Sequence, residues 1–476
     1  MKKIISLFLS LTFVLTLCSC GKKANSGKTI AASVGKGDFR AGFARVEIVP
    51  DESVPLAGLG NTERRMSTGY IDPIYINAVA FADENGDVLA TLVCDNVKIQ
   101  KVISDVALKK ISEETGLPED HIFISATHTH SAPDTGNTKI SSVIRYNSAF
   151  INWMVDAVKQ SIADLKSAKI YMGTTTITGY NFVRHYLCKD GTYAGDNFGD
   201  YSSGIVRHET EADHEMRLVR LERKDGKDIL MTNFQVHPTM NCGDTECDVS
   251  ADLVGIFRDN MEEMNDVHCI YYQGASGNIN PRSEITSETP TRDYRQYGKE
   301  LAEKASTALK NLKEAKSGNI VVSKKSITAD INHTEDSLVQ AATVVNVVWT
   351  STNDFSQAKA EAKKLGLHSQ YHATGILERA KLPKTENFDI SAAKIGDLSF
   401  IGAPYEMFDV NGMEIREKSP YKMTFIIGYF AGHRGYIPAD YSYDNKCYEA
   451  DTSRYIKGTA EQVAKEFISM LGSLKG

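Results

Sequence analysis

Short apolar runs alternate along the chain with longer stretches in which apolar residues recur every three or four positions. Val88–Cys94 and Ile122–Ala126 are almost continuously apolar, which is typical of buried strands. Helical spacing follows each of them, over Val102–Thr115 with Gly116 as the expected C-cap, and over residues 151–165. Strands that alternate with helices in this way predict an α/β architecture.

The remaining elements continue the alternation. Further strands are expected at residues 229–236, 267–272, 319–327 and 398–402, and helices at 294–315, 358–365 and 459–474. Residues 339–348 have helical spacing but are rich in valine, so that a strand remains open. No Pro- or Ser-rich linker divides residues 40–476. We therefore predict one large domain over residues 39–476, with mixed β-sheets and surrounding helices.

The N-terminus has the pattern of a targeting segment. Lys2 and Lys3 precede an apolar run, Ile4–Leu17, that is too short to span a membrane and indicates a signal peptide. Leu17-Cys18-Ser19-Cys20 resembles the bacterial lipobox, which implies a signal peptide over 1–19 and a lipidated Cys20. Residues 20–38 then form a flexible tether. We expect an extracytoplasmic lipoprotein anchored to a bacterial membrane; an ordinary signal peptide with incidental cysteines is the alternative.

Charge and cysteine content exclude some classes of function. The net charge is -7 and Lys and Arg form no long cluster, so we expect no nucleic-acid partner, and nothing implies a protein partner. No C-x-x-C motif occurs, so a thiolate zinc site is not expected. Cys242 and Cys247 are spaced to close a small disulfide loop, and buried free thiols are the alternative.

Two histidines follow the strand expected at residues 122–126. His128 and His130 lie in Ser125–Pro133, among small residues that leave room for a ligand. In extended chain, residues i and i+2 point to the same side, so both imidazoles are expected to face one site at the strand end. Imidazole is the commonest metal ligand and also shuttles protons near neutral pH. The alternative is a pair of surface or capping histidines.

Three other segments carry polar residues at strand ends or in glycine-rich loops. His237 ends a strand before Pro238, and Glu406 stands among apolar residues in Gly402–Phe408, where burial of a carboxylate requires a partner or a metal. Residues 431–438 form a glycine-rich loop with a Tyr, a His and an Arg. Taken singly, each has a plain alternative: a polar loop start, a helix N-terminal acid or a structural turn. Their convergence on one site is the prediction.

These motifs together resemble a known family. Thr-His-Thr-His-Ser (127–131), Val-His-Pro-Thr (236–239), Pro-Tyr-Glu-Met-Phe (404–408) and Gly-Tyr-Ile-Pro (435–438) occur in the same order as in neutral ceramidases. Residues 41–50 also resemble the start of that family's catalytic domain. The resemblance covers residues 40–460 and implies a zinc-dependent hydrolase of an amide bond, acting on a ceramide-like or other N-acyl substrate.

The resemblance also implies a site. One Zn²⁺ would be held by His128, His237, Glu406 and Tyr436, with Tyr429 and Tyr441 as nearby alternatives for the tyrosine. His130 would face the substrate and stabilise the oxyanion or protonate the leaving group, and Arg184 would contact the substrate. In such a site zinc activates a bound water and polarises the scissile carbonyl.

The sequence departs from the family at a serine near the metal. That serine follows a Gln directly, and here the position is Gly274, with Ser276 two residues on as the candidate replacement. The glycine-rich run 273–281 fits a tight turn that presents backbone N–H groups to the site, and a purely structural turn after the strand at 267–272 is the equal alternative. The β-sandwich domain that follows in full-length ceramidases is expected to be absent.

The departure leaves the substrate open. The alternatives are a related metallohydrolase of a non-lipid ester or amide, and a non-catalytic substrate-binding lipoprotein. An apolar groove beside the metal would favour a lipid, and a polar pocket would favour a non-lipid substrate.

Overall fold

The computed structural model describes residues 30–59, 65–243 and 246–475. The expected signal peptide, Cys18, Cys20 and most of the tether lie outside the described residues. Within the described ranges, no helix is both long and apolar enough to cross a membrane. The six cysteines in these ranges are free, so the disulfide between Cys242 and Cys247 does not form.

A large mixed sheet forms the first layer of the core. Its nine strands in the described chain are, in order, β14 (Val267–Gln273), β12 (Asp228–Phe234), β11 (Glu215–Arg223), β6 (Lys166–Thr176), β1 (Arg40–Glu47), β3 (Tyr75–Ala82), β4 (Val88–Cys94) and β5 (Ile122–Ala126), with β16 (Lys313–Ala315) paired to β6. β4 runs parallel to β5 and β12 parallel to β14, whereas the other neighbours are antiparallel.

A second sheet packs face to face against the first. It consists of β17 (Ile320–Asp330), β18 (Thr385–Ile395), β19 (Leu398–Gly402) and β21 (Met423–Ile427), of which β19 and β21 are parallel. Phe81 of the first sheet contacts Phe400 of the second with ring centroids 6.0 Å apart, and both belong to one buried apolar cluster. Strands that are buried on both faces read as continuous apolar runs, which explains the pattern of β4 and β5.

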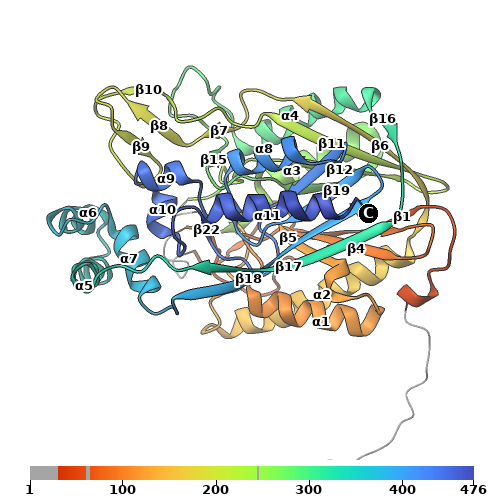
Figure 1. Ribbon diagram of the computed structural model, residues 1–476, viewed down its shortest axis with the longest axis horizontal. Helices are drawn as coiled ribbons and strands as arrows, with labels where there is room; N and C mark the ends of the chain where they lie inside the picture. Colours follow the sequence, from red (N-terminus) through yellow and green to blue (C-terminus); the bar gives the residue numbers. More distant parts are fainter. Residues whose placement is uncertain (1–29, 60–64, 244–245, 476) are drawn as a thin grey trace, which may run out of the picture.

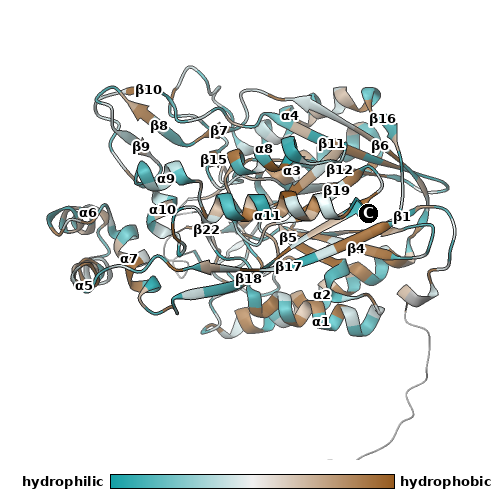
Figure 2. Ribbon diagram, viewed as in Figure 1, coloured by the Kyte–Doolittle hydropathy of each residue, from teal (hydrophilic) through white to brown (hydrophobic). Residues whose placement is uncertain are grey.

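Helices cover the two outer faces. Over the first sheet lie α1 (Lys101–Thr115), α2 (Ser141–Ala163), α3 (Asp252–Asn265) and α4 (Tyr294–Ala308), and over the second lie α8 (Asp409–Lys418) and α11 (Thr459–Ser473). In Figure 2, hydrophobic residues follow β4, whereas α1 and α11 alternate between hydrophobic and hydrophilic residues, as expected for helices with one buried face.

Three helices form an excursion between β17 and β18. They are α5 (Asp336–Thr352), α6 (Phe355–Lys364) and α7 (Gln370–Arg379). A separate small apolar cluster, which includes Val345, Leu367 and Ile376, holds them together. Figure 1 shows this group at the left end of the molecule, and α7 packs on α10 (Tyr448–Thr452).

Short elements complete the described chain. They are the 3-10 turns η1 (Ala31–Ser33), η3 (Glu119–His121) and η4 (Leu309–Asn311), the strands β2 (Gly69–Tyr70), β7 (Phe182–Val183), β8 (His185–Cys188), β9 (Tyr193–Gly195), β10 (Ile205–His208), β13 (Asp248–Val249), β15 (Ile279–Asn280), β20 (Glu406–Met407) and β22 (Tyr436–Ile437), and the helix α9 (Asp440–Asp444).

The α/β prediction and most of the predicted elements are confirmed. Gly116 caps α1 with a left-handed φ of 80°. Residues 339–348 are helical in α5, which settles the open choice. The helix expected over 294–315 was too long, because α4 ends at Ala308 and the chain turns through η4 into the edge strand β16.

Candidate metal centre

The site lies where the carboxyl ends of strands from both sheets meet. Ala126, the last residue of β5, donates its N–H to the carbonyl of Tyr429, which follows β21, at 3.2 Å. The Gly428 N–H donates to the carbonyl of Gln273, the last residue of β14, at 3.0 Å. Strand ends of an open α/β sheet are the usual place for a ligand. As expected, the motif residues follow strands: His128 and His237 follow strands of the large sheet, and Glu406 follows a strand of the second sheet.

His128 and His130 come together by a different backbone path from the expected one. β5 ends at Ala126, and His128 has a left-handed φ of 69°, so the segment is not extended there. The His128 N–H donates to the Asn96 carbonyl at 2.9 Å, which helps to hold this conformation. The two Nε2 atoms still lie 3.1 Å apart. The predicted convergence is present, but the reason given for it was wrong.

His237 approaches from the other half of the large sheet. Its Nε2 lies 3.1 Å from His128 Nε2. The Nδ1 atom of each of these two rings contacts a backbone carbonyl, that of Val97 at 2.6 Å for His128 and that of Ser276 at 2.8 Å for His237. A carbonyl can only accept, so each Nδ1 carries the proton and each neutral ring has a free electron pair on Nε2.

Glu406, the first residue of β20, faces both imidazoles. Its Oε2 lies 3.4 Å from His128 Nε2 and 3.6 Å from His237 Nε2, and its Oε1 lies 3.5 Å from His433 Nε2. Oε2 is buried and accepts no hydrogen bond. Burial lowers the pKa of His128 well below its usual value, so that this ring is neutral and suited to bind a metal.

These donors fit a metal cation. Two Nε2 electron pairs 3.1 Å apart cannot hydrogen-bond to each other when both protons are on Nδ1, and the carboxylate oxygen beside them also lacks a donor. Such an arrangement of acceptors is costly in a buried site unless a cation lies between them. His128, His130 and His237 also bring ligand atoms within 4.8 Å of one another.

Of the three candidate tyrosines, Tyr436 is the one that lines the same cavity as His128, His130 and Glu406. β22 places it directly beside Glu406 through parallel pairing of Glu406 with Tyr436. Tyr429 stacks on the buried side of His128, with ring centroids 3.9 Å apart, and Tyr441 bonds His185 instead. The geometry therefore favours Tyr436 as the tyrosine ligand, a role that stays a prediction.

Arg184 lies behind Tyr436. Its Nη2 donates to the Tyr436 hydroxyl at 3.1 Å and lies 2.6 Å from Glu449 Oε1. Its exposed fraction is only 6%, and it does not line the cavity that holds the histidines. The structure thus gives Arg184 a positioning contact, whereas direct contact with substrate remains a prediction. Glu449, which holds Arg184, was missed because no motif marks it.

Ser276 is fully buried and its Oγ lies 2.9 Å from the Tyr429 hydroxyl, so it contacts the layer behind the ligands. In the glycine-rich run, the N–H groups of Gly274 and Gly277 are used by the fold, because they donate to the carbonyls of Phe234 and Met407. The run presents the carbonyls of Ser276 and Ile279 to the site, and these fix the tautomer of His237. The two glycines thus do not contribute to the expected N–H cradle.

Gly274, at the position of the family serine, has little room for a side chain. A Cβ there would lie 2.8 Å from Gln235 Oε1 and 3.1 Å from the Phe234 carbonyl oxygen. Gln235 is itself fixed by a hydrogen bond to the Asp213 carbonyl. The sequence lacks the family serine, and neighbouring atoms occupy the space that its side chain would need.

Two cavities border the candidate centre. One, of about 310 Å³, is lined by His128, His130, Glu406 and Tyr436 together with Ala57, Leu59 and Val97. The second, of about 550 Å³, shares Lys98, Glu406, Tyr436 and Tyr448 with the first.

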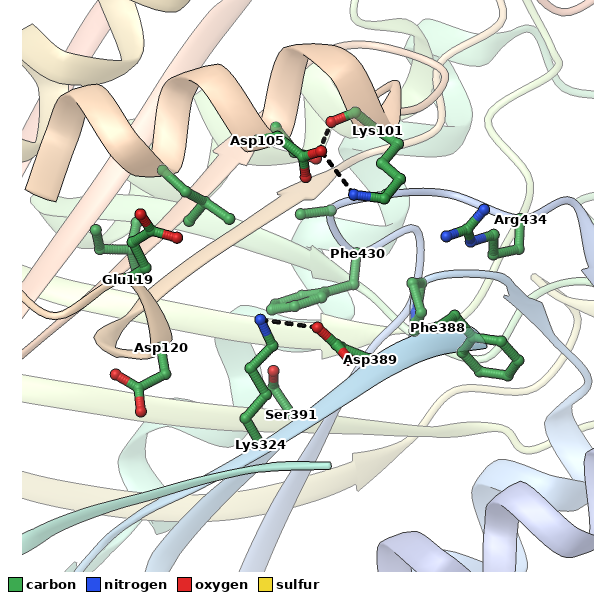
Figure 3. Close-up of a pocket in the computed structure, with 16 residues that line it drawn as sticks. Lys101, Asp105, Glu119, Asp120, Lys324, Phe388, Asp389, Ser391, Phe430 and Arg434 are labelled. Carbon is green, nitrogen blue, oxygen red and sulfur yellow. Dashed lines mark hydrogen bonds and ion pairs between the residues drawn. The ribbon is translucent and has the colours of Figure 1, made fainter. Parts of the chain in front are cut away.

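The cavity in Figure 3 lies elsewhere, at the edge of α1 and the second sheet. Its charges are largely paired, with Lys101 at 2.6 Å from Asp105 and Lys324 at 2.9 Å from Asp389. None of the four ligand candidates lines it.

Comparisons with known proteins agree with this geometry. The model of the family described as neutral/alkaline non-lysosomal ceramidase, N-terminal, matches residues 39–276, half of the chain. The fold is similar to that of a neutral ceramidase from Pseudomonas aeruginosa, with a TM-score of 0.68 and 16% identity over 92% of this chain and 74% of that chain. A ceramidase complexed with C2 gives a TM-score of 0.67 and 17% identity, over 92% and 75%. No curated protein sequence matches the chain.

Proposed function

Because the chain belongs to the neutral/alkaline non-lysosomal ceramidase family, we propose that it is a zinc-dependent hydrolase that cleaves the amide bond of a ceramide-like or other N-acyl substrate. The observation that carries the proposal is that His128, His237 and Glu406 meet at one buried point. There the Nε2 atoms of the two histidines and Oε2 of Glu406 lie close together without a hydrogen-bond donor between them. Neutral imidazoles and a carboxylate suit zinc. When bound, zinc supplies an activated water at neutral pH and polarises a carbonyl.

The protein's own residues would then have separate tasks. Glu406 is a ligand and not the base, because its oxygens point at the three histidines around it. Burial lowers the pKa of His130 to about 3, so its ring is neutral. A neutral ring has one N–H, with which we propose that it stabilises the developing oxyanion; to protonate the leaving nitrogen it would first have to take up a proton on its other nitrogen, as it could from the attacking water.

Tyr436 is the proposed fourth ligand. Burial raises its pKa well above the usual value, and the charge of Arg184 opposes that rise. A tyrosine ligand must ionise, so Arg184 and the bound metal would act in the same direction. Arg184 thereby supports the proposed site even if it never touches the substrate.

A second candidate, a hydrolase of a non-lipid ester or amide, is favoured by the second cavity. Its lining is mostly polar and charged. Among the described residues that line it, Leu382 is the one large aliphatic residue. The non-catalytic alternative requires a cleft without converging ligands, and the geometry of His128, His237 and Glu406 speaks against it.

We also propose that the enzyme works outside the cytoplasm, anchored through a lipid on Cys20. The support is the lipobox-like Leu17-Cys18-Ser19-Cys20. Fractionation of cells that express Cys20→Ala should find the protein released from the membrane. Membrane attachment unchanged in that variant would contradict the proposal.

Hydrolysis of a panel of N-acyl compounds, with a short-chain ceramide among them, tests the activity. The zinc-loaded protein should release fatty acid from at least one of them, and His128→Ala should reduce kcat by about a thousandfold or more, since loss of a metal ligand removes the activated water. His121→Ala is the matched control, because His121 lies on η3 and should leave the rate unchanged. A zinc-loaded protein that cleaves no amide or ester would contradict the proposal.

A further inference from the structure

The second cavity beside the metal centre is strongly basic. Five of its lining residues are Lys or Arg, namely Lys98, Arg379, Lys381, Arg434 and Arg454, and two are carboxylates, Glu378 and Glu406. Glu406 is already committed to the histidines. A cavity of this charge would be made still more positive by a divalent cation at its edge.

Only part of this charge is balanced. Arg434 and Arg454 both pair with Glu386. Within the described part of the chain, Lys98, Arg379 and Lys381 form no ion pair. Lys98, Arg379 and Lys381 therefore outnumber the two carboxylates that act on Arg379, Glu378 of the lining and Asp451 of α10.

Arg379 is built into the wall. It is only 2% exposed, and its Nη1 donates to the carbonyls of Asp451 at 2.7 Å and Ser453 at 2.8 Å. Its Nε is buried and has no hydrogen-bond partner. Burial lowers the pKa of Arg379, the carboxylates of Asp451 and Glu378 oppose that shift, and the unused Nε can still donate to a further anion.

We propose that the substrate carries a negatively charged group, a carboxylate, phosphate or sulfonate, that binds in this basic cavity while the scissile bond lies at the metal centre. The inference rests on the proposed hydrolase function. Lys98, Glu406, Tyr436 and Tyr448 line both cavities, so a single molecule can span the boundary between them.

Each of the two cavities suits a different part of such a substrate. The smaller one has Ala57, Leu59 and Val97 in one part of its wall, beside polar residues that include Lys98 and Asp134, and these apolar residues can contact a short acyl group. The larger one offers charged donors, which recognise an anion through charge-assisted hydrogen bonds. A ceramide with two uncharged chains would leave these cations desolvated and unpaired.

Matched pairs of substrates test the proposal on the zinc-loaded full-length mature chain. N-hexanoylglycine is compared with its neutral twin N-hexanoylglycinamide, and phosphorylated N-hexanoylethanolamine with N-hexanoylethanolamine. The charged member of at least one pair should show a kcat/KM at least about tenfold higher, equal to about 1.4 kcal/mol. The pair with the larger ratio identifies the carboxylate or the phosphate as the preferred anion.

Charge variants connect the preference to the cavity. Lys381→Gln and Lys98→Gln should each lower the charged-to-neutral ratio by about threefold to tenfold, because each removes one cation from the anion site. Lys109→Gln on the exposed face of α1 is the control with the same charge change and should keep the ratio. A ratio near one in the wild type, or a ratio unchanged in both cavity variants, would overturn the proposal.

Failure of the hydrolase proposal has a different signature. If no compound is cleaved, calorimetry with the same pairs still measures binding without interference from turnover. Tighter binding of the charged twin, weakened in Lys381→Gln, would uphold the anion site and reject only the hydrolysis. Equal binding of the twins would reject the anion site as well.

Discussion

The metal centre and the basic cavity share Lys98, Glu406, Tyr436 and Tyr448, but their remaining walls are built from different parts of the molecule. His128, His237 and Glu406 follow strands of the two packed sheets, and their positions are fixed by the core. Arg379 and Lys381 belong to the end of the α5–α7 excursion, which has its own small apolar cluster. The excursion is also more exposed. Val347 on α5 is 58% exposed, whereas every residue of β5, which precedes His128, is buried.

This difference separates chemistry from selectivity. Ligands mounted on a close-packed core hold their geometry, because cores tolerate little change of volume. A wall carried by peripheral helices can change its exposed charges, such as Lys381, at small cost to the fold, whereas the buried Arg379 is itself part of the packing. We therefore expect substitutions near the ligands to affect folding and chemistry together, and substitutions in the excursion to affect substrate preference.

The largest effect is expected at Glu449, behind the proposed tyrosine ligand. Its side chain lies 2.6 Å from Arg184 Nη2 and 2.9 Å from His185 Nε2, all fully or nearly buried. Glu449→Gln leaves two buried basic groups without their anion and should lower the free energy of unfolding by about 3–5 kcal/mol. Urea denaturation measures this. Glu52→Gln, which breaks an exposed pair with Arg145, is the control and should show no resolvable change.

The pH dependence sharpens this first prediction. Burial opposes the ionisation of Glu449, but the charges of His185 and Arg184 prevail and lower its pKa to about 2. Because an unfolded Glu has a pKa of about 4.3, the stabilisation is complete above that pH and is lost as the pH falls toward 2. The gap in stability between wild type and Glu449→Gln should thus narrow over this range. A constant gap would show that the charge of Glu449 is not its source.

A smaller effect is expected when the family serine is restored. Gly274→Ser places a side chain against Gln235 and the Phe234 carbonyl and should cost about 1–3 kcal/mol of stability through overpacking. No gain in hydrolysis is expected, because the new hydroxyl has to displace Gln235. Thermal unfolding and the N-acyl assay measure both. A stable variant with raised kcat would show that the serine position remains usable.

The smallest effect on folding is expected in the excursion. Lys381 is exposed and forms no ion pair within the described residues, so Lys381→Gln should change the free energy of unfolding by no more than about 0.5 kcal/mol. The same variant should alter the preference between charged and neutral substrates. Destabilisation comparable to that of Gly274→Ser would contradict the separation of the two walls.

The sequence predicted the fold class and the meeting of His128, His237 and Glu406, because these residues stand at the ends of apolar strands with a clear pattern. It could not predict the backbone at His128, whose left-handed φ depends on contacts with Asn96 from another strand end. It also could not predict that the Ser276 carbonyl accepts from His237 Nδ1, because that contact depends on where His237 lies in the fold.

The basic cavity had no local signal in the sequence. Lys98 precedes α1, Arg379 ends α7 and Arg454 follows α10, so they are far apart along the chain and look like ordinary helix-end charges. The packing of α7 on α10 brings Arg379 and Arg454 together, and the fold places Lys98 on the same cavity. Glu449 was missed for the same reason, because its role comes from Arg184, which lies on a distant segment.

Metal content tests the central claim most directly. The soluble form that lacks residues 1–20 is purified, supplied with zinc, dialysed and measured by mass spectrometry beside His128→Ala and Glu406→Ala. We predict about one zinc per wild-type chain and loss of that zinc in both variants, with circular dichroism showing that they remain folded. A folded wild-type chain that stays metal-free after zinc is supplied would contradict the account.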